Sequence, residues 1–288
     1  MPANEPLVLV RGGGDLASGV ILRLHRSGLK VVVSELPQPL AVRRAVSFAE
    51  AVYDGEHTVE GVTARLVDAD RIKPAMEAGE VPVIIDPDAG ILLSSFLFPI
   101  VVDARLTKQP PVPLPQPVPV HIGLGPGFHA GRNCDAVIET RRSHTLGRVL
   151  WQGAAQEDSG QPEGDPRRVL RAPEDGIFIG HKRIGEHCEP GEILGEVQSK
   201  IANRKSEIVN PLRGVLRGMI RDGVDVSKGL KIGDIDPRDE PSACFLVSDK
   251  ALAIGGGVLE AILTRVDIRK QLWTPSALWA PPPNPTQS

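Results

Sequence analysis

Residues 7–26 read LVLVRGGGDLASGVILRLHR, and this stretch decides the fold of the first half of the chain. The apolar run at 7–10 has the composition of a buried strand and is followed directly by three glycines, 12–14. Apolar residues then recur with helical spacing over 16–26, before Gly28 ends the segment. A buried strand, a glycine turn and an amphipathic helix in this order predict the first βα unit of a parallel sheet.

Further β-type runs alternate with helical stretches downstream. The expected strands cover 31–33, 62–67, 81–85, 99–102, 118–124 and 136–139, and the expected helices cover 39–53 and 70–79. This alternation predicts an α/β domain over residues 1–150, built on a Rossmann-like parallel sheet with right-handed crossovers. The proline-rich stretch 109–119 lies within this domain and is expected to form a linker.

A second unit, expected over residues 166–240, contains one glycine pattern twice. Gly176, Gly180, Gly185, Gly191 and Gly195 recur 38 residues later as Gly214, Gly218, Gly223, Gly229 and Gly233. Duplicated short β runs with glycine turns predict a small β barrel-sandwich, which resembles the two halves of a biotinyl or lipoyl carrier domain. Carrier domains modify a lysine at the central hairpin, whereas residues 201–203 (Ile-Ala-Asn) occupy its tip here. Covalent biotin or lipoate is therefore not expected.

The end of the chain divides into a return segment and a tail. The return segment covers 241–265 and is expected to become helical over 250–265, although it contains three consecutive glycines. The tail, 266–288, is rich in proline and is expected to be loosely held.

Composition and charge limit the class of protein. The net charge of −3 gives no general attraction to nucleic acid or to an anionic membrane, and no apolar run approaches the length of a membrane span. The first residues do not have the pattern of a signal peptide, and the three cysteines form no CxxC pair. Metal-ligand spacing is found neither in His129, Cys134, Glu139 and His144 nor in His181, His187 and Cys188. We expect a cytoplasmic protein with reduced thiols and no metal site.

The glycine turn is the first candidate site. Glycine there lets backbone N–H groups approach a pyrophosphate at the positive end of the following helix. Glu35, at the end of the second strand, is placed to accept hydrogen bonds from ribose hydroxyls. The cofactor-binding residues expected at this edge of the sheet are Gly12, Gly13, Gly14, Asp15, Ala17, Glu35, Asp86, Asp103, Gly125 and Gly127. The alternative for each is structural, since tight turns need glycine and aspartate commonly caps helices.

Several segments together resemble the YqeB-type family, accessory proteins linked to selenium-dependent molybdenum hydroxylases. They include VRGGGDLASGVILRLHRSG, VVDARLTK, IGLGPGFHAG, AVIETRRSHTLGRV and SDKALAIGGGVLEAIL. Arg141 and Ser143 depart from the family pattern, in which we expect asparagine and glycine. The resemblance implies a Rossmann-like domain joined to a barrel-sandwich module, and a role in assembling or maturing a molybdenum hydroxylase. That enzyme or its maturation machinery is then the expected partner, and self-association into a homo-oligomer stays open.

Three functions stay open at this point. The first is an accessory protein whose crevice binds a nucleotide-bearing cofactor, such as molybdopterin dinucleotide. The second is an NAD(P)-dependent oxidoreductase, for which Tyr53 is the only tyrosine that could donate a proton. The third is a non-catalytic scaffold. The sequence assigns no catalytic residue and does not decide whether the chain is an enzyme.

Overall fold

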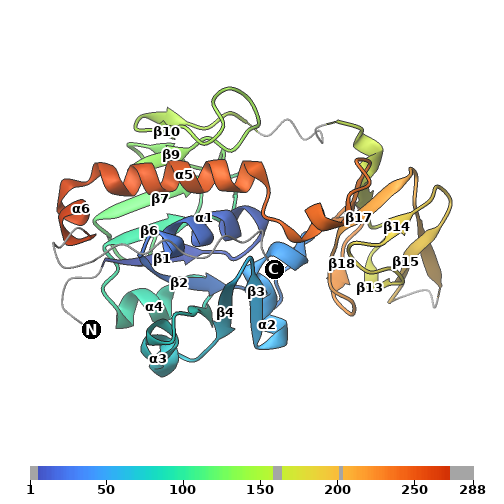
Figure 1. The fold of residues 1–288 in the computed structure, drawn as a ribbon, viewed down its shortest axis with the longest axis horizontal. Helices are drawn as coiled ribbons and strands as arrows, with labels where there is room; N and C mark the ends of the chain where they lie inside the picture. Colours follow the sequence, from blue (N-terminus) through green and yellow to red (C-terminus); the bar gives the residue numbers. More distant parts are fainter. Residues whose placement is uncertain (1–5, 158–163, 201–203, 273–288) are drawn as a thin grey trace.

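The computed structural model describes residues 6–157, 164–200 and 204–272. Its larger part, the α/β domain (residues 6–157 and 249–272), is built on a nine-stranded sheet in the order β10-β9-β7-β6-β1-β2-β5-β4-β3 (Figure 1). The strands are β1 (Leu7–Arg11), β2 (Lys30–Glu35), β3 (Glu56–Val59), β4 (Val62–Leu66), β5 (Val81–Ile85), β6 (Ile100–Asp103), β7 (Val120–Leu124), β9 (Ala136–Ile138) and β10 (Val149–Leu150). The strands from β9 to β4 run parallel, whereas β10 and β3 pair antiparallel at the two edges. A mixed α/β fold with a large, mainly parallel sheet is thus confirmed.

Helices cover both faces of this sheet. They are α1 (Asp15–Arg26), α2 (Ala51–Asp54), α3 (Ile72–Glu77), α4 (Gly90–Ser95), α5 (Asp249–Thr264) and α6 (Val266–Leu272). Successive side chains of β1 alternate between two hydrophobic layers. Val8 and Val10 lie in the layer that contains α1 and α5, and Leu7 and Leu9 lie in the layer that contains α3 and α4. Two-sided burial explains why the central strands read as continuous apolar runs.

Close packing explains two of the three glycines inside α5, Gly255 against α1 and Gly257 against the loop at Gly147. A Cβ atom on Gly19 would lie 2.5 Å from the backbone of Ala251, and one on Gly255 would lie 2.6 Å from the carbonyl oxygen of Gly19. A Cβ atom on Gly257 would likewise lie 2.0 Å from the carbonyl oxygen of Gly147. The expected helix at 250–265 is confirmed to within a residue, because close packing decides its course despite the low helix propensity of glycine.

The second part, the β module (residues 169–236), consists of two four-stranded antiparallel sheets around one core. The sheet orders are β12-β19-β17-β14 and β16-β15-β13-β18. The strands are β12 (Val169–Arg171), β13 (Gly176–Gly180), β14 (His187–Cys188), β15 (Ile193–Gln198), β16 (Lys205–Val209), β17 (Gly214–Met219), β18 (Asp225–Val226) and β19 (Lys231–Asp236). The three strands β13, β14 and β15 recur as β17, β18 and β19 at the spacing of the glycine repeat. Each sheet takes strands from both repeats, whereas the finer barrel-sandwich assignment stays a prediction.

Two expectations about secondary structure are wrong. Residues 39–53 do not form one helix; they form two 3₁₀ turns, η1 (Arg44–Val46) and η2 (Phe48–Glu50), followed by the short α2. Ser47 between the turns is extended and buried, and its hydroxyl donates to the carbonyl oxygen of Arg43 at 2.9 Å. The start of the tail is not loosely held, because residues 266–272 form α6 and Ile268 is only 2% exposed. The rest of the tail, 273–288, and the hairpin tip, 201–203, lie outside the described residues.

The surroundings of the cysteines fit inert thiols. Cys134, Cys188 and Cys244 are buried and unpaired, and burial raises the pKa of Cys134 to about 11. A thiol with a raised pKa is protonated near neutral pH and is a poor nucleophile. Within the described part of the chain, no helix is long and apolar enough to cross a membrane.

Candidate functional site

The glycine turn after β1 is occupied by protein groups on one side and open on the other. The carboxylate of Glu35 accepts hydrogen bonds from the N–H groups of Gly13, at 2.6 Å, and of Leu36, at 2.7 Å. Burial raises the pKa of Glu35, and these two N–H groups oppose that rise. A Cβ atom on Gly13 would lie 2.9 Å from the backbone nitrogen of Ala49, whereas Gly14 has nothing within 4 Å. Gly14 is therefore the position of the turn at which a ligand has room.

Two of the three predicted aspartates, Asp86 and Asp103, bind other groups of the protein. Asp86 accepts the N–H of Leu92 in the first turn of α4 at 2.9 Å, which is the capping role that aspartate often has. Asp103 is fully buried and pairs with Arg11 at 3.1 Å and with Arg105 at 2.6 Å. Nothing in this geometry tests a ligand at either side chain, so that role stays a prediction.

The other predicted small residues stand where the backbone needs them. Gly12 has a φ of +92° and Gly125 has a φ of +94°, a region that favours glycine. A Cβ atom on Gly127 would lie 2.4 Å from the carbonyl oxygen of Gln109, and Ala17 is 1% exposed within the core. These structural roles are compatible with a ligand nearby but do not require one.

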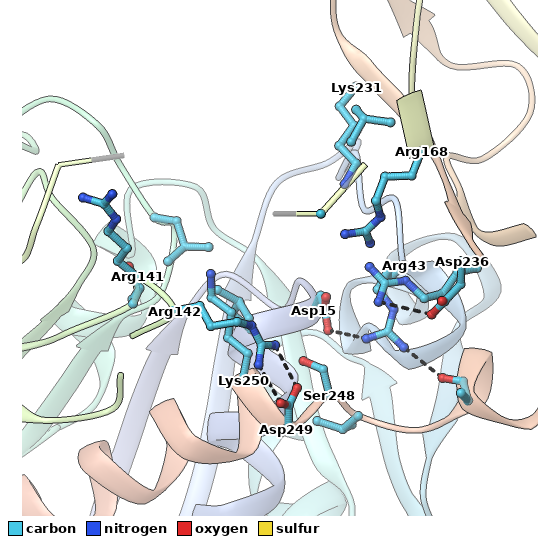
Figure 2. A pocket seen from close by; sticks show the side chains of 18 of the residues that line it. Asp15, Arg43, Arg141, Arg142, Arg168, Lys231, Asp236, Ser248, Asp249 and Lys250 are labelled. Atoms are coloured by element: carbon cyan, nitrogen blue, oxygen red, sulfur yellow. Dashed lines mark hydrogen bonds and ion pairs between the residues drawn. The ribbon is translucent and has the colours of Figure 1, made fainter. Parts of the chain in front are cut away.

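A large cleft of about 1200 Å³ lies between the α/β domain and the β module, beside the start of α1 (Figure 2). Nine basic residues line it among those described: Arg43, Lys108, Arg141, Arg142, Arg168, Arg217, Lys231, Arg238 and Lys250. Four acidic residues line it as well: Asp15, Asp165, Asp236 and Asp249. A chain with a net charge of −3 therefore concentrates positive charge on this surface.

Two helices begin at this cleft and add to its positive potential. Asp15 is the first residue of α1, and Ser248 caps α5 by accepting the N–H of Ala251 at 3.2 Å. Arg142 holds Asp249 with two hydrogen bonds of 2.6 and 2.9 Å, which keeps the pKa of this carboxyl well below its usual range (Figure 2). The N-terminal ends of helices carry partial positive charge, so both favour an anion in the cleft.

The cations on the α/β side differ in how they are held. Arg43 is buried, pairs with Asp15 at 3.3 Å, and donates to the carbonyl oxygens of Ala243 and Leu246. Arg43 therefore ties the glycine turn to the segment that leads into α5. Neither Arg141 nor Lys250 has an ion-pair partner among the described residues, so both cations are available to a ligand.

The cations on the β-module side share few carboxylates. Asp234 is fully buried and meets Arg168 at 2.9 Å, Arg217 at 2.8 Å through its Nε, and Lys231 at 3.9 Å. Asp236 is paired with the exposed Arg238, which lowers the pKa of Asp236 to about 2. Arg217 and Lys231 thus share one fully buried carboxylate on this wall.

Sequence reasoning found the start of α1 but missed most of the cleft. Its cations come from segments up to two hundred residues apart, as in the contact between Arg43 and Leu246, and they follow no local motif. One feature of the repeat does point to the cleft: Lys231 and Arg217 stand where the first copy has the isoleucines Ile193 and Ile179. Within the ranges that the structure describes, no group of three or more His, Cys, Asp or Glu side chains is placed to hold a metal ion.

Comparison with known proteins shows that the sequence is similar to that of an uncharacterized protein. No family model matches the chain. Over 269 residues it is 47% identical to the uncharacterized protein YqeB of Escherichia coli strain K12, an alignment that covers 91% of the chain and 48% of that protein. This likeness supports the prediction that the chain is of the YqeB type. The chain spans about half the length of the YqeB protein that it matches. That protein is itself uncharacterized, so the likeness assigns no cofactor, reaction or partner to a YqeB-type chain.

Solved structures give only distant matches. The succinylglutamate desuccinylase/aspartoacylase from Rhodobacter sphaeroides is 11% identical, with a TM-score of 0.25 over 81% of this chain and 86% of that one. An aspartoacylase family protein from Mesorhizobium loti MAFF303099 is also 11% identical, with a TM-score of 0.26 over 81% and 84% of the two chains. Scores this low establish neither a shared fold nor a shared activity.

Proposed function

We propose that this chain binds a nucleotide-bearing cofactor in the cleft between its α/β domain and its β module, and acts as an accessory protein in the maturation of a molybdenum hydroxylase. The observation that most supports this proposal is that nine basic side chains and two helix N-termini lie around one cleft. Arginine, lysine and helix N-termini are the groups that proteins use to hold phosphates. The maturation role rests on the resemblance to the YqeB-type family.

The size of the cleft supports a ligand larger than a mononucleotide. Its volume of about 1200 Å³ exceeds the roughly 300–1,000 Å³ typical of small-molecule pockets. A dinucleotide such as molybdopterin dinucleotide has a pyrophosphate that suits the open side of the turn at Gly14. Lys250 and Arg141 would then meet the same phosphates from α5 and from the loop after β9. The chain would hold and shield the cofactor.

The oxidoreductase alternative has less support. Tyr53 donates to the carbonyl oxygen of Pro39 at 2.8 Å, and the guanidinium of Arg221 lies 4.7 Å from its ring centroid. Tyr53 does not line the cleft, and no tyrosine or histidine does so among the described residues. A hydride-transfer site with a Tyr or His proton donor is therefore not assembled there. A pure scaffold would not need two cations without carboxylate partners, Arg141 and Lys250, in a cleft.

Binding is tested by thermal shift and native mass spectrometry with NAD(H), NADP(H), ADP and molybdopterin dinucleotides. We compare the unmodified chain with Gly14→Asp, using Gly14→Ser as the matched control. Gly14 is the N-cap of α1 and has open space around it, so both side chains fit and only aspartate adds negative charge. We expect a shift with a dinucleotide that survives in Gly14→Ser and weakens about tenfold or more in Gly14→Asp. Hydride turnover would support the oxidoreductase instead, and no shift with any ligand would contradict the binding role.

The maturation role needs a separate experiment. A molybdenum hydroxylase is produced together with the unmodified chain, with Gly14→Asp or with Gly14→Ser, and its molybdopterin content is measured. We expect a lower content with Gly14→Asp alone. Equal content in all three preparations would remove the accessory role while leaving ligand binding intact.

A further inference from the structure

We propose that the β-module wall of the cleft forms a second anion subsite, made by Arg168, Arg217 and Lys231 around Asp234, so that the ligand carries two separated anionic groups. This inference rests on the proposed function, because it specifies the ligand of the same cleft. It gives the β module a direct role in binding.

Three cations converge on one carboxylate in this subsite. Arg168 comes from the 3₁₀ turn η4 (Pro166–Arg168), Arg217 from β17, and Lys231 from the start of β19. All three approach Asp234, which is 0% exposed. Asp234 is the carboxylate that these three cations share, and Asp236, 3.7 Å from Arg217, is also paired with Arg238. Planar guanidinium groups held in place by a buried carboxylate are suited to phosphate or carboxylate recognition.

The repeat supplies an internal control for the role of these cations. At the spacing of the glycine repeat, Arg217 corresponds to Ile179 and Lys231 corresponds to Ile193, and β13 pairs with β15 as β17 pairs with β19. The first copy thus builds the same strands without either cation. The strands themselves do not require these cations. The buried Asp234, which stands where the first copy has Glu196, needs a cation as its partner, and a ligand on the cleft wall would account for the presence of more than one.

Electrostatics in the ligand-free protein agree with this inference. Partial burial lowers the pKa of Lys231; Asp234 opposes this shift, and the nearby Arg168 and Arg217 add to it. A bound anion would oppose that shift. Figure 2 shows Lys231 and Arg168 on one side of the cleft and Arg141, Arg142 and Lys250 on the other. A ligand that reaches both walls therefore needs an anionic group at each end.

The test uses isothermal titration calorimetry of the full chain with inorganic tripolyphosphate and with orthophosphate. The variants are Lys231→Gln, Lys250→Gln and, as the matched control, Lys228→Gln, which removes an exposed lysine outside the cleft. Lys231→Ile is a second variant, because isoleucine occupies the equivalent position of the first repeat. We expect both changes at Lys231, and the change at Lys250, to weaken tripolyphosphate binding about tenfold or more. We expect Lys231→Gln to retain orthophosphate binding at the other wall.

The outcomes separate the two proposals. Loss of tripolyphosphate affinity in Lys250→Gln but unchanged affinity in both Lys231 variants would overturn the second subsite and leave the cleft as a binding site. Absence of binding of either probe to the unmodified chain would overturn both proposals. An equal loss in Lys228→Gln would show that only overall charge matters, and this result would also overturn the second subsite.

Discussion

At Lys231 a partly buried ammonium group lies beside two arginines. Its pKa is lowered mainly by desolvation; Arg168 and Arg217 lower it further, whereas Asp234 and Asp15 raise it. The unfolded chain therefore holds this proton to higher pH than the native chain does. Lys231 consequently lowers the stability of the native protein at neutral pH, and the penalty fades as pH rises toward the unfolded pKa.

We predict that Lys231→Ile has a melting temperature equal to or above that of the unmodified chain at pH 7. The difference between the two proteins should shrink as pH rises toward about 10.4, the ordinary pKa of lysine. Differential scanning calorimetry from pH 7 to pH 10.5 measures this directly. A variant that melts well below the parent at pH 7 would mean that Lys231 is structural.

At the residue scale, the sequence indicates the structural role of a side chain best where its partner is local. Asp86 accepts an N–H in the first turn of α4, which is the structural alternative to its predicted role in cofactor binding, and that role stays a prediction. Glu35 was selected for its place after the second strand, but its partner Gly13 could not be inferred. That hydrogen bond depends on the register of β1 against β2, which only the folded sheet sets.

At the scale of elements, apolar runs predict the seven parallel strands of the large sheet and the helices α1, α3 and α5. They do not predict the edge strands β3 and β10 or the short helices α4 and α6, and exceptions arise where tertiary contacts decide local structure. Residues 39–53 have helical spacing but break into 3₁₀ turns, because Arg43 and Arg44 turn to contact the segments at 243–246 and the β module. The helix at α5 persists through its glycines for the same kind of reason, since α1 lies against it.

Neighbouring glycines of α5 give a matched stability test. Gly255→Ala places a Cβ atom 2.6 Å from Gly19 and should destabilise the protein by about 1–3 kcal/mol through overpacking. Gly256→Ala meets nothing within 4 Å and should stabilise it by about 0.5–1 kcal/mol, because alanine has the higher helix propensity. Urea unfolding of both variants gives the two free energies. Equal effects of the same sign would contradict the close packing of α1 against α5.

At the scale of the whole molecule, the cleft exists only because the β module is held against the α/β domain. Arg221 of the module reaches Glu50 at 3.1 Å and Asp54 at 2.6 Å, and its guanidinium lies over the ring of Tyr53. Glu50 is only 2% exposed, and burial raises its pKa. No sequence pattern connects these residues, so neither the interface nor the cleft could be predicted from the repeat and the glycine turn alone.

We predict that Arg221→Gln destabilises the protein by about 1–3 kcal/mol, because Glu50 then keeps only the longer contact to Arg44, at 3.7 Å. Tripolyphosphate affinity should fall as well, since one wall of the cleft is less firmly placed. Arg213→Gln is the control, because Arg213 is largely exposed and lies outside the cleft; a change within about 0.5 kcal/mol is expected. Unchanged stability and affinity in Arg221→Gln would show that this contact does not hold the β module against the α/β domain.

The most direct measurement is a crystal structure of the chain with ADP bound. Our account predicts both phosphates inside the cleft, near the N-terminal ends of α1 and α5 and within reach of Lys250 or Lys231. Phosphates bound instead at the opposite edge of the sheet, or on the outer surface of either part, would contradict it.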